Sequence, residues 1–112
     1  MPLIDKATFD ELKQISGAVF INELIDTFLD DAPMMMQEMK SALEAGDTDT
    51  FRRAAHSMKS NAATFGASQL AELAKELEAL GRENRLAEAG NRLTALEEAI
   101  RSACDELREL KS

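Results

Sequence analysis

The chain has 112 residues, a formal net charge of −8 and a sequence pI of about 4.6. This length suffices for one domain with a hydrophobic core, so we expect a single domain over residues 1–112. The acidic balance and the absence of Trp and Tyr argue against a nucleic-acid partner, because the chain offers neither a basic surface nor a base-stacking platform.

Cysteine content and hydropathy indicate in which cell compartment the protein is expected. Cys104 is the only cysteine, which excludes an intrachain disulfide and indicates a small core residue in a reducing environment. No apolar run reaches the ~20 residues of a membrane span, and the N-terminus lacks a signal-peptide pattern. We therefore expect a cytoplasmic protein without a membrane partner. One His and one Cys are also too few for a zinc site, so we expect no bound metal.

Helical periodicity runs through the chain, and no segment alternates as a strand does. A first helix is predicted from Thr8 to about Gly17, because Thr8 and Glu11 have the spacing of a capping box. A second helix carries an apolar stripe over residues 20–29. We expect Pro33 to end it, because proline lacks the backbone N–H that a continuing helix requires.

A third helix is predicted over residues 33–45, closed by Gly46. Met34, Met35 and Met36 follow one another in this helix. They suit core filling, but at least one of the three must be exposed, because consecutive residues point to different sides of a helix.

Three more helices complete the chain. Asp47 or Thr48 caps the fourth, which ends at Gly66, and Ser68 caps the fifth. The sixth covers residues 86–110 with apolar residues at alternating spacings of three and four. Because all connections are short, we predict an all-α fold, an antiparallel four-helix bundle of the third to sixth helices, with the N-terminal helices as a cover.

The fourth predicted helix carries the only histidine of the chain. Its apolar residues form one stripe: Phe51, Ala55, Met58, Ala62 and Phe65. His56 lies about 140° from the centre of this stripe at about 100° per residue, so its imidazole is predicted to face solvent. Arg52 and Lys59 stand beside it on the same face, and the surrounding segment holds no acid.

A solvent-facing imidazole between cations suits a phosphoryl acceptor. Its ring nitrogen is an available nucleophile at neutral pH, and nearby cations stabilise a transferring phosphoryl group. The chain has neither a GxxxxGK[ST] loop nor a kinase-type glycine-rich loop, so it is predicted to carry a phosphoryl group rather than to take one from ATP as an enzyme. In the simpler alternative His56 is inert, and Arg52, Arg53 and Lys59 form an ordinary solvated face.

The stretch AHSMKSNAATFGA from Ala55 to Ala67 resembles the signature of histidine-containing phosphotransfer (HPt) domains, A-H-[ST]-[LM]-K-[GS]-[SAN]-A-x-x-[LFIV]-G-A. The preceding FLDDAPMMMQEMKSALEAGDTDTFRRAAH and the following LAELAKELEALGR are similar to the flanking segments of that family. The resemblance covers nearly the whole chain. It implies a phosphorelay intermediate that takes a phosphoryl group from a receiver-domain aspartyl phosphate and passes it to another receiver aspartate.

The resemblance also implies residue roles. His56 would be the phosphorylated residue, Lys59 the cation that supports the phosphoryl group, and Gly66 the glycine that ends the helix. Ser60 stands where many members have glycine, and its small side chain should preserve access. The receiver would contact Arg52, Arg53, Ser60, Ala63 and Gly66.

The partners expected from the resemblance are receiver domains of response regulators or hybrid histidine kinases, bound by a monomer of this chain. The chain itself would need no cofactor, because the receiver would supply a divalent ion such as Mg²⁺. The alternative is a helical binding module that docks on a receiver without being phosphorylated.

Overall fold

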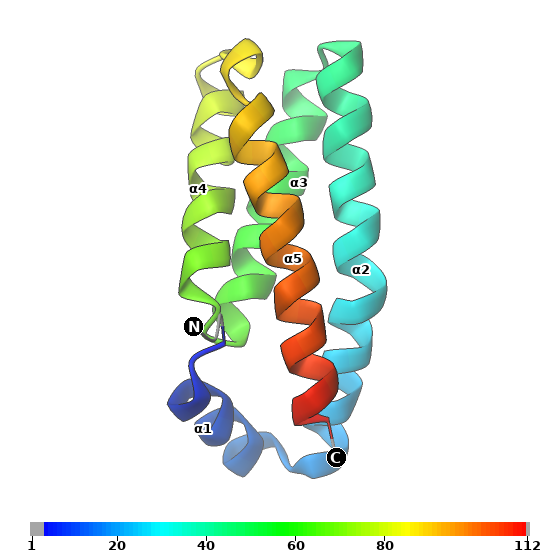
Figure 1. Ribbon diagram of the computed structural model, residues 1–112, viewed down its shortest axis with the longest axis vertical. Helices are drawn as coiled ribbons and strands as arrows, with labels where there is room; N and C mark the ends of the chain where they lie inside the picture. The colour runs from blue at the N-terminus through cyan, green and yellow to red at the C-terminus, as the bar shows by residue number, and fades with distance from the viewer. Residues whose placement is uncertain (1–3, 112) are drawn as a thin grey trace.

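The structure, a computed structural model, describes residues 4–111. Its elements are α1 (Lys6–Ser16), α2 (Ala18–Ala45), α3 (Thr48–Thr64), α4 (Ser68–Arg82), the short 3₁₀ helix η1 (Leu86–Glu88) and α5 (Gly90–Leu110). Figure 1 shows α2 to α5 side by side along the long axis, with α1 lying across one end. The predicted all-α class, with a four-helix bundle and an N-terminal cover, is confirmed.

The predicted helix break at Pro33 is wrong, because α2 runs without interruption from Ala18 to Ala45. The second and third predicted helices are therefore one element, and only α1 serves as the cover. Pro33 has no backbone N–H to donate to the carbonyl of Leu29, four residues earlier. Because Pro33 lies on the exposed side of α2, water can hydrogen-bond to that carbonyl instead.

Packing explains why α2 continues through its proline. Its buried side chains continue on one stripe before and after Pro33: Ile21, Ile25, Phe28, Ala32, Met35, Met36, Met39 and Ala42. A proline within a helix costs about 3 kcal/mol, whereas burying a single large apolar side chain contributes about 1.5–3 kcal/mol. The stripe as a whole outweighs the proline. As the sequence predicted for the methionine run, one member, Met34, is exposed.

The start of α1 also differs from the prediction. Asp5, not Thr8, is the N-cap, and its carboxylate accepts hydrogen bonds from the backbone N–H of Ala7 at 3.2 Å and the Thr8 hydroxyl at 2.8 Å. The backbone N–H of Asp5 donates to the carbonyl of Gly66 at 3.2 Å, which joins the cover helix to the end of α3. Asp5 is a better cap than Thr8, because its carboxylate accepts hydrogen bonds from two donors at once.

Two further helix starts need correction. Ser68 is the first residue of α4 and not its cap, and the N-cap position belongs to Ala67 without a side-chain hydrogen bond. The predicted sixth helix is divided into η1 and α5, which begins at Gly90. Of Asp47 and Thr48, the two caps predicted for the fourth helix, Asp47 is the N-cap, and its carboxylate accepts from the backbone N–H of Thr50 at 3.2 Å; Thr48 is the first residue of α3.

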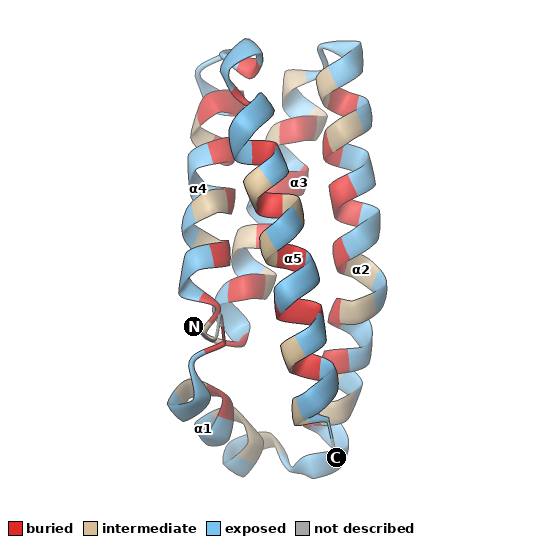
Figure 2. Cartoon of the chain, viewed as in Figure 1, coloured by how far each residue is buried: buried red, intermediate tan, exposed pale blue. Residues whose placement is uncertain are grey.

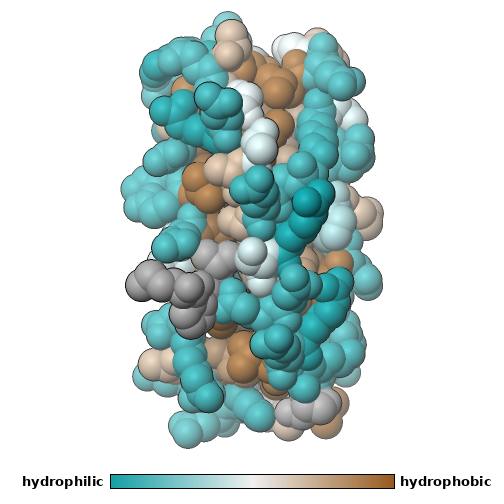
Figure 3. All heavy atoms as spheres, in the orientation of Figure 1, coloured by the Kyte–Doolittle hydropathy of each residue, from teal (hydrophilic) through white to brown (hydrophobic). Residues whose placement is uncertain are grey.

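Buried residues face the axis of the bundle on all four long helices, as Figure 2 shows. Cys104 is among them, as the sequence predicted. On the face seen in Figure 3, hydrophilic side chains cover most of the surface, and hydrophobic ones are visible between them. No helix in the described part of the chain is long and apolar enough to cross a membrane.

Candidate functional site

The histidine of α3 is displayed by the packing of its own helix. Phe51, Ala55, Met58 and Ala62 are fully buried, which fixes the opposite face of α3 toward solvent. His56 lies on that face with 58% of its side chain exposed. The orientation predicted from the helical angle is therefore confirmed.

Glu78 of α4 is the residue that the sequence analysis missed. It is 4% exposed and is the one buried charged residue within residues 4–111. Its Oε2 lies 2.6 Å from Nδ1 of His56, and its Oε1 accepts a hydrogen bond from Nζ of Lys59 at 2.7 Å. Arg82, one turn further along α4, brings a guanidinium nitrogen to 3.7 Å from Oε1. One carboxylate therefore joins the two functional candidates of α3.

The environment keeps Glu78 ionised. Burial by itself raises the pKa of this carboxyl, but hydrogen bonds from Lys59 and His56, together with the charge of Lys59, outweigh burial and hold the pKa below its usual value. An ionised carboxylate can only accept hydrogen bonds, so Nδ1 of His56 must carry the hydrogen that it donates to Oε2. In the neutral imidazole, the other ring nitrogen, Nε2, then carries the lone pair, on a side chain that is 58% exposed.

The prediction that His56 lies among cations without acids is wrong, because acidic side chains pair with those cations. Lys59 is paired with Glu78, while Arg52 and Arg53 both pair with Asp49, at 2.9 and 3.1 Å. The positive charges predicted around the imidazole are therefore largely balanced by acids. These acids were missed for two reasons: Glu78 is distant in sequence, and Asp49 is a full turn before the histidine motif.

Close approach of α3 and α4 allows Glu78 to reach His56. A Cβ placed on Gly81 would lie 3.1 Å from Cβ of Arg52 and 3.3 Å from its Cα. Such distances are shorter than ordinary van der Waals contact, and the Cα belongs to backbone that cannot move aside alone. A glycine three residues after Glu78 therefore permits the helix spacing at which this carboxylate bridges to α3.

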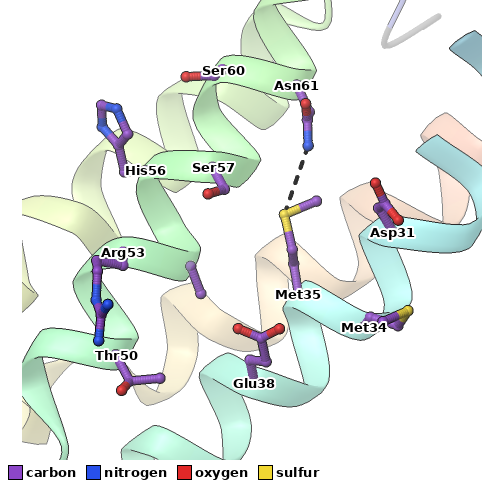
Figure 4. Close-up of a pocket in the computed structure, with 11 residues that line it drawn as sticks. Asp31, Met34, Met35, Glu38, Thr50, Arg53, His56, Ser57, Ser60 and Asn61 are labelled. Atoms are coloured by element: carbon purple, nitrogen blue, oxygen red, sulfur yellow. Dashed lines mark hydrogen bonds between the residues drawn. The ribbon is translucent and has the colours of Figure 1, made fainter. Parts of the chain in front are cut away.

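A groove of about 620 Å³ runs between α2 and α3, with His56 at its edge (Figure 4). The α3 wall includes Arg53, Ser57 and Ser60 beside the histidine. Across the groove, α2 contributes Asp31, Met34, Met35 and Glu38. Ser60 is exposed, as its predicted place in receiver contact requires.

Of the remaining residues predicted to contact a partner, Arg52 lines neither this groove nor the next one, and the other two lie elsewhere. Ala63 and Gly66 line a second groove of about 360 Å³ between α3 and α4, together with Lys59. Gly66 has a φ of +69°, and a Cβ there would lie 2.8 Å from Cβ of Thr8, so its glycine is required by the turn and by α1. The structure thus divides the predicted contact residues between the two sides of α3.

The helix end at Gly66 has a simple local cause. Its N–H donates to the carbonyl of Ala63, and the N–H of Ala67 reaches back to Ala62, which is the paired pattern of a Schellman motif. α3 itself ends at Thr64, two residues before the predicted glycine.

The sequence around Glu78 contains a weak signal of its role. Its segment, LAELAKELEALGR, places Leu70, Leu77 and Leu80 on the buried stripe of α4. Glu78 is adjacent to that stripe, next to Leu77, and an acid in such a position needs a partner when it is buried. The pattern marks Glu78 as unusual but does not say which cation or imidazole it meets.

Across residues 4–111, no three His, Cys, Asp or Glu side chains gather closely enough to hold a metal ion. The chemistry available at the site is that of one free imidazole nitrogen, backed by a carboxylate and flanked by cations.

Comparisons with known proteins identify the family of the chain. Residues 23–110 match the family model of the Hpt domain. The structure also matches the crystal structure of histidine-containing phosphotransfer protein B from Pseudomonas aeruginosa PAO1, with a TM-score of 0.92 and 27% sequence identity, over 98% of this chain and 95% of that one. No curated protein sequence matches the chain significantly. Because the family match spans most of its length, the chain belongs to the Hpt domain family.

Proposed function

We propose that His56 accepts a phosphoryl group through Nε2 from the aspartyl phosphate of one receiver domain and delivers it to an aspartate of another. As an Hpt domain, the chain is a phosphorelay intermediate of two-component signalling that works with receiver domains. The proposal adds the residue, the ring nitrogen and the supporting groups.

The observation that supports this assignment is the bond between His56 and Glu78. A hydrogen bond from Nδ1–H to the ionised carboxylate favours the neutral tautomer whose lone pair lies on Nε2. The same hydrogen bond restricts rotation of the imidazole, so Nε2 is held in one orientation. A nucleophile that is already oriented loses less entropy when it attacks phosphorus in line with the bond that breaks.

The transfer step requires no proton to leave the histidine. The Nε2 lone pair forms the N–P bond as the bond between phosphorus and the receiver's aspartate oxygen breaks, and that aspartate departs as a carboxylate. The imidazole ring thereby gains a positive charge, which the negative charge of Glu78 offsets across the Nδ1 hydrogen bond. In the onward step, the N–P bond breaks and the ring leaves as neutral imidazole, because Nδ1 has kept its hydrogen throughout.

Lys59 supports this chemistry in two ways. Its ammonium group at 2.7 Å from Glu78 keeps that carboxylate ionised, and it remains about one-third exposed, so it also faces incoming phosphoryl oxygens. Arg82 supplies a second cation, 3.7 Å from the same oxygen of Glu78 that Lys59 contacts.

We further propose that the chain acts as a monomer in the cytoplasm, is not itself an enzyme, and needs no cofactor of its own. The divalent ion that phosphoryl transfer requires would be held by the receiver. No nucleotide-binding motif occurs in the sequence, which supports transfer between proteins rather than from ATP.

The test is to incubate the chain with a receiver domain that has been phosphorylated by radiolabelled acetyl phosphate. We expect label on this chain that is acid-labile and base-stable, as a phosphoramidate is, and NMR should place the phosphorus on Nε2. His56→Gln should carry no label. Stable binding of a receiver without any label would instead favour a non-covalent docking module, and label on Nδ1 would overturn the assignment of the tautomer.

A further inference from the structure

The imidazole of His56 is open to water. Its side chain is 58% exposed, and it lies at the edge of the groove between α2 and α3 (Figure 4). Water can therefore reach a phosphoryl group on Nε2, so hydrolysis competes with delivery to a receiver. Because the site is open, its shape cannot protect the N–P bond. Protection has to come from the ring itself and from the groups bonded to it.

The two oxygens of Glu78 have different partners. Oε2 lies 2.6 Å from Nδ1 of His56. Oε1 accepts a hydrogen bond from Nζ of Lys59 at 2.7 Å and lies 3.7 Å from a guanidinium nitrogen of Arg82. A phosphoryl group on Nε2 would attract these two cations through its negative oxygens. Because both cations contact Oε1, Oε2 can stay with the ring when they turn toward the phosphoryl group.

Charged side chains of three helices lie around the site: Asp31 and Glu38 of α2, Arg52, Arg53 and Lys59 of α3, and Glu78 and Arg82 of α4. Both arginines of α3 pair with Asp49. In the part of the chain that the structure describes, only Glu78 makes a polar contact with the imidazole. Because Coulomb interactions weaken with distance, this carboxylate has the largest effect on the charge of the ring.

Hydrolysis removes the positive charge that phosphorylation gives the ring. A water oxygen forms a new P–O bond as the N–P bond breaks, the electron pair of that bond returns to Nε2, and both protons of the water leave with the phosphate. A ring with hydrogen on Nδ1 departs as neutral imidazole. A ring without that hydrogen would have to depart as an anion, which is a much poorer leaving group. Cleavage of the form with hydrogen removes positive charge beside the Glu78 carboxylate, so the carboxylate opposes cleavage.

We propose that Glu78 sets the lifetime of the phosphoryl group on His56, by slowing hydrolysis in mild acid and by keeping the lifetime nearly constant up to mildly alkaline pH. This inference rests on the proposed function, because it concerns the phosphorylated form of that histidine. Glu78 acts through the imidazole and does not touch phosphorus, so it is a positioning residue that holds charge and hydrogen at Nδ1.

The two effects dominate at different pH. In mild acid the ring bears the Nδ1 hydrogen in every variant, and the carboxylate slows cleavage by stabilising the charged ring. In mild alkali a ring without the carboxylate loses that hydrogen and its hydrolysis slows steeply, whereas a ring bonded to Glu78 retains it. Glu78 is ionised throughout this range, because hydrogen bonds from Lys59 and His56 outweigh burial and hold the pKa of its carboxyl below the usual value of 4.5.

The test follows the loss of radiolabel from the folded chain between about pH 5.5 and about pH 9. The chain is labelled with radiolabelled phosphoramidate, which needs no receiver, and the free donor is removed before the pH is changed. Glu78→Gln removes the charge but keeps an oxygen that can accept from Nδ1. Glu76→Gln is the matched control, because Glu76 is an exposed acid of the same helix. Glu38→Gln removes an acid that lines the groove without contacting the ring. The unaltered chain unfolded in urea is a reference that needs no variant, because unfolding separates Nδ1 from the carboxylate.

Near pH 5.5, Glu78→Gln and the unfolded chain should lose label about tenfold faster than the folded, unaltered chain. Between about pH 5.5 and about pH 9, the rate should fall by about tenfold or more in those two samples, and vary by less than about threefold in the unaltered chain. Nitrogen NMR of the phosphorylated ring at the alkaline end should find hydrogen on Nδ1 in the unaltered chain and not in Glu78→Gln. Glu76→Gln and Glu38→Gln should match the unaltered chain within about twofold at every pH.

Parallel pH profiles of the unaltered chain and Glu78→Gln would overturn the inference. If Glu78→Gln does not fold, parallel profiles of the folded and unfolded chain would do the same. A change in Glu38→Gln as large as that in Glu78→Gln would also overturn it, because the effect would then belong to the acids of the groove in general. A chain labelled by phosphoramidate but by no receiver would refute the proposed function, and the pH profile would still decide the role of Glu78. A chain that takes no label from either donor would overturn both.

Discussion

Nδ1 of His56 lies 2.6 Å from Oε2 of Glu78, although one side chain is largely exposed and the other almost wholly buried. The contact anchors a solvent-facing imidazole to a buried carboxylate of the bundle. It also favours the neutral imidazole with its hydrogen on Nδ1 and its lone pair on Nε2, because an ionised carboxylate can only accept a hydrogen bond.

Removing this carboxylate should slow phosphorylation without removing the acceptor. We expect Glu78→Ala to lower the rate of labelling by phosphoramidate by about tenfold to hundredfold, a typical effect of losing a partner that orients a functional imidazole. Glu78→Gln should retain more activity, because its amide oxygen can still accept from Nδ1. Proton–nitrogen NMR correlation spectra of the imidazole check the cause: hydrogen should remain on Nδ1 in Glu78→Gln and be shared between both nitrogens in Glu78→Ala. Equal rates in all three proteins would contradict a positioning role.

The same carboxylate should make stability depend on pH. The folded-state pKa of Glu78 is lower than its usual value of 4.5, because the hydrogen bonds from Lys59 and His56 outweigh burial. The unfolded chain therefore binds a proton first as pH falls, and the stabilisation is present above about pH 4.5 and lost as pH falls toward the folded pKa.

Urea unfolding of the unaltered chain and Glu78→Gln measures this contribution. The difference in free energy of unfolding between them should be larger at pH 7 than at pH 3. A difference that grows as the pH is lowered would have the wrong sign for a paired carboxylate.

The spacing of α3 and α4 should depend on Gly81. We expect Gly81→Ala to lower the free energy of unfolding by about 1–3 kcal/mol, because overpacking against the Arg52 backbone outweighs the better helix propensity of alanine. It should also weaken the bond between His56 and Glu78, which shifts the imidazole NMR signals toward a mixture of tautomers.

Gly90→Ala is the matched control, because a Cβ there meets nothing within 4 Å. It should leave both stability and tautomer nearly unchanged. Identical behaviour of the two variants would mean that the close approach at Gly81 does not position Glu78.

Access to the imidazole should depend on the size of residue 60. Ser60 is exposed and lines the groove with His56 one turn away, so Ser60→Leu should reduce the rate from a receiver relative to that from phosphoramidate by about tenfold or more. Ser60→Gly should keep that ratio but lower the free energy of unfolding by about 0.5–1 kcal/mol. Ser102→Leu, on an exposed site of α5, controls for the added apolar surface. A constant ratio across Gly, Ser and Leu would mean that receivers do not approach over this face.

The continuous α2 should be stabilised by removing its proline. Pro33→Ala supplies the N–H that the carbonyl of Leu29 lacks, and it should raise the free energy of unfolding by about 2 kcal/mol once the greater freedom of the unfolded chain is included. Urea midpoints at constant m-value would measure it. An unchanged or lower midpoint would indicate that the proline serves the packing of α2 rather than interrupting it.

The sequence by itself determined what depends on one helix at a time. Periodicity predicted the all-α bundle, and the position of Asp47 just before a periodic segment predicted a helix cap. The angle between His56 and the apolar stripe of its helix predicted exposure of the imidazole. The run of methionines required one exposed member, which is Met34. Each of these follows from geometry within a few turns of the same helix.

Only the tertiary structure decided what depends on two helices together. Local propensity predicted a break at Pro33, but burial of the stripe on both sides keeps α2 whole. Glu78 meets His56 across 22 positions because α4 approaches α3 closely at Gly81. Periodicity gives the direction of a side chain about its own helix axis, whereas the side chain that it meets depends on the distance and register between helices. Those are set by how side-chain volumes fit across the interface, and no single segment contains that information.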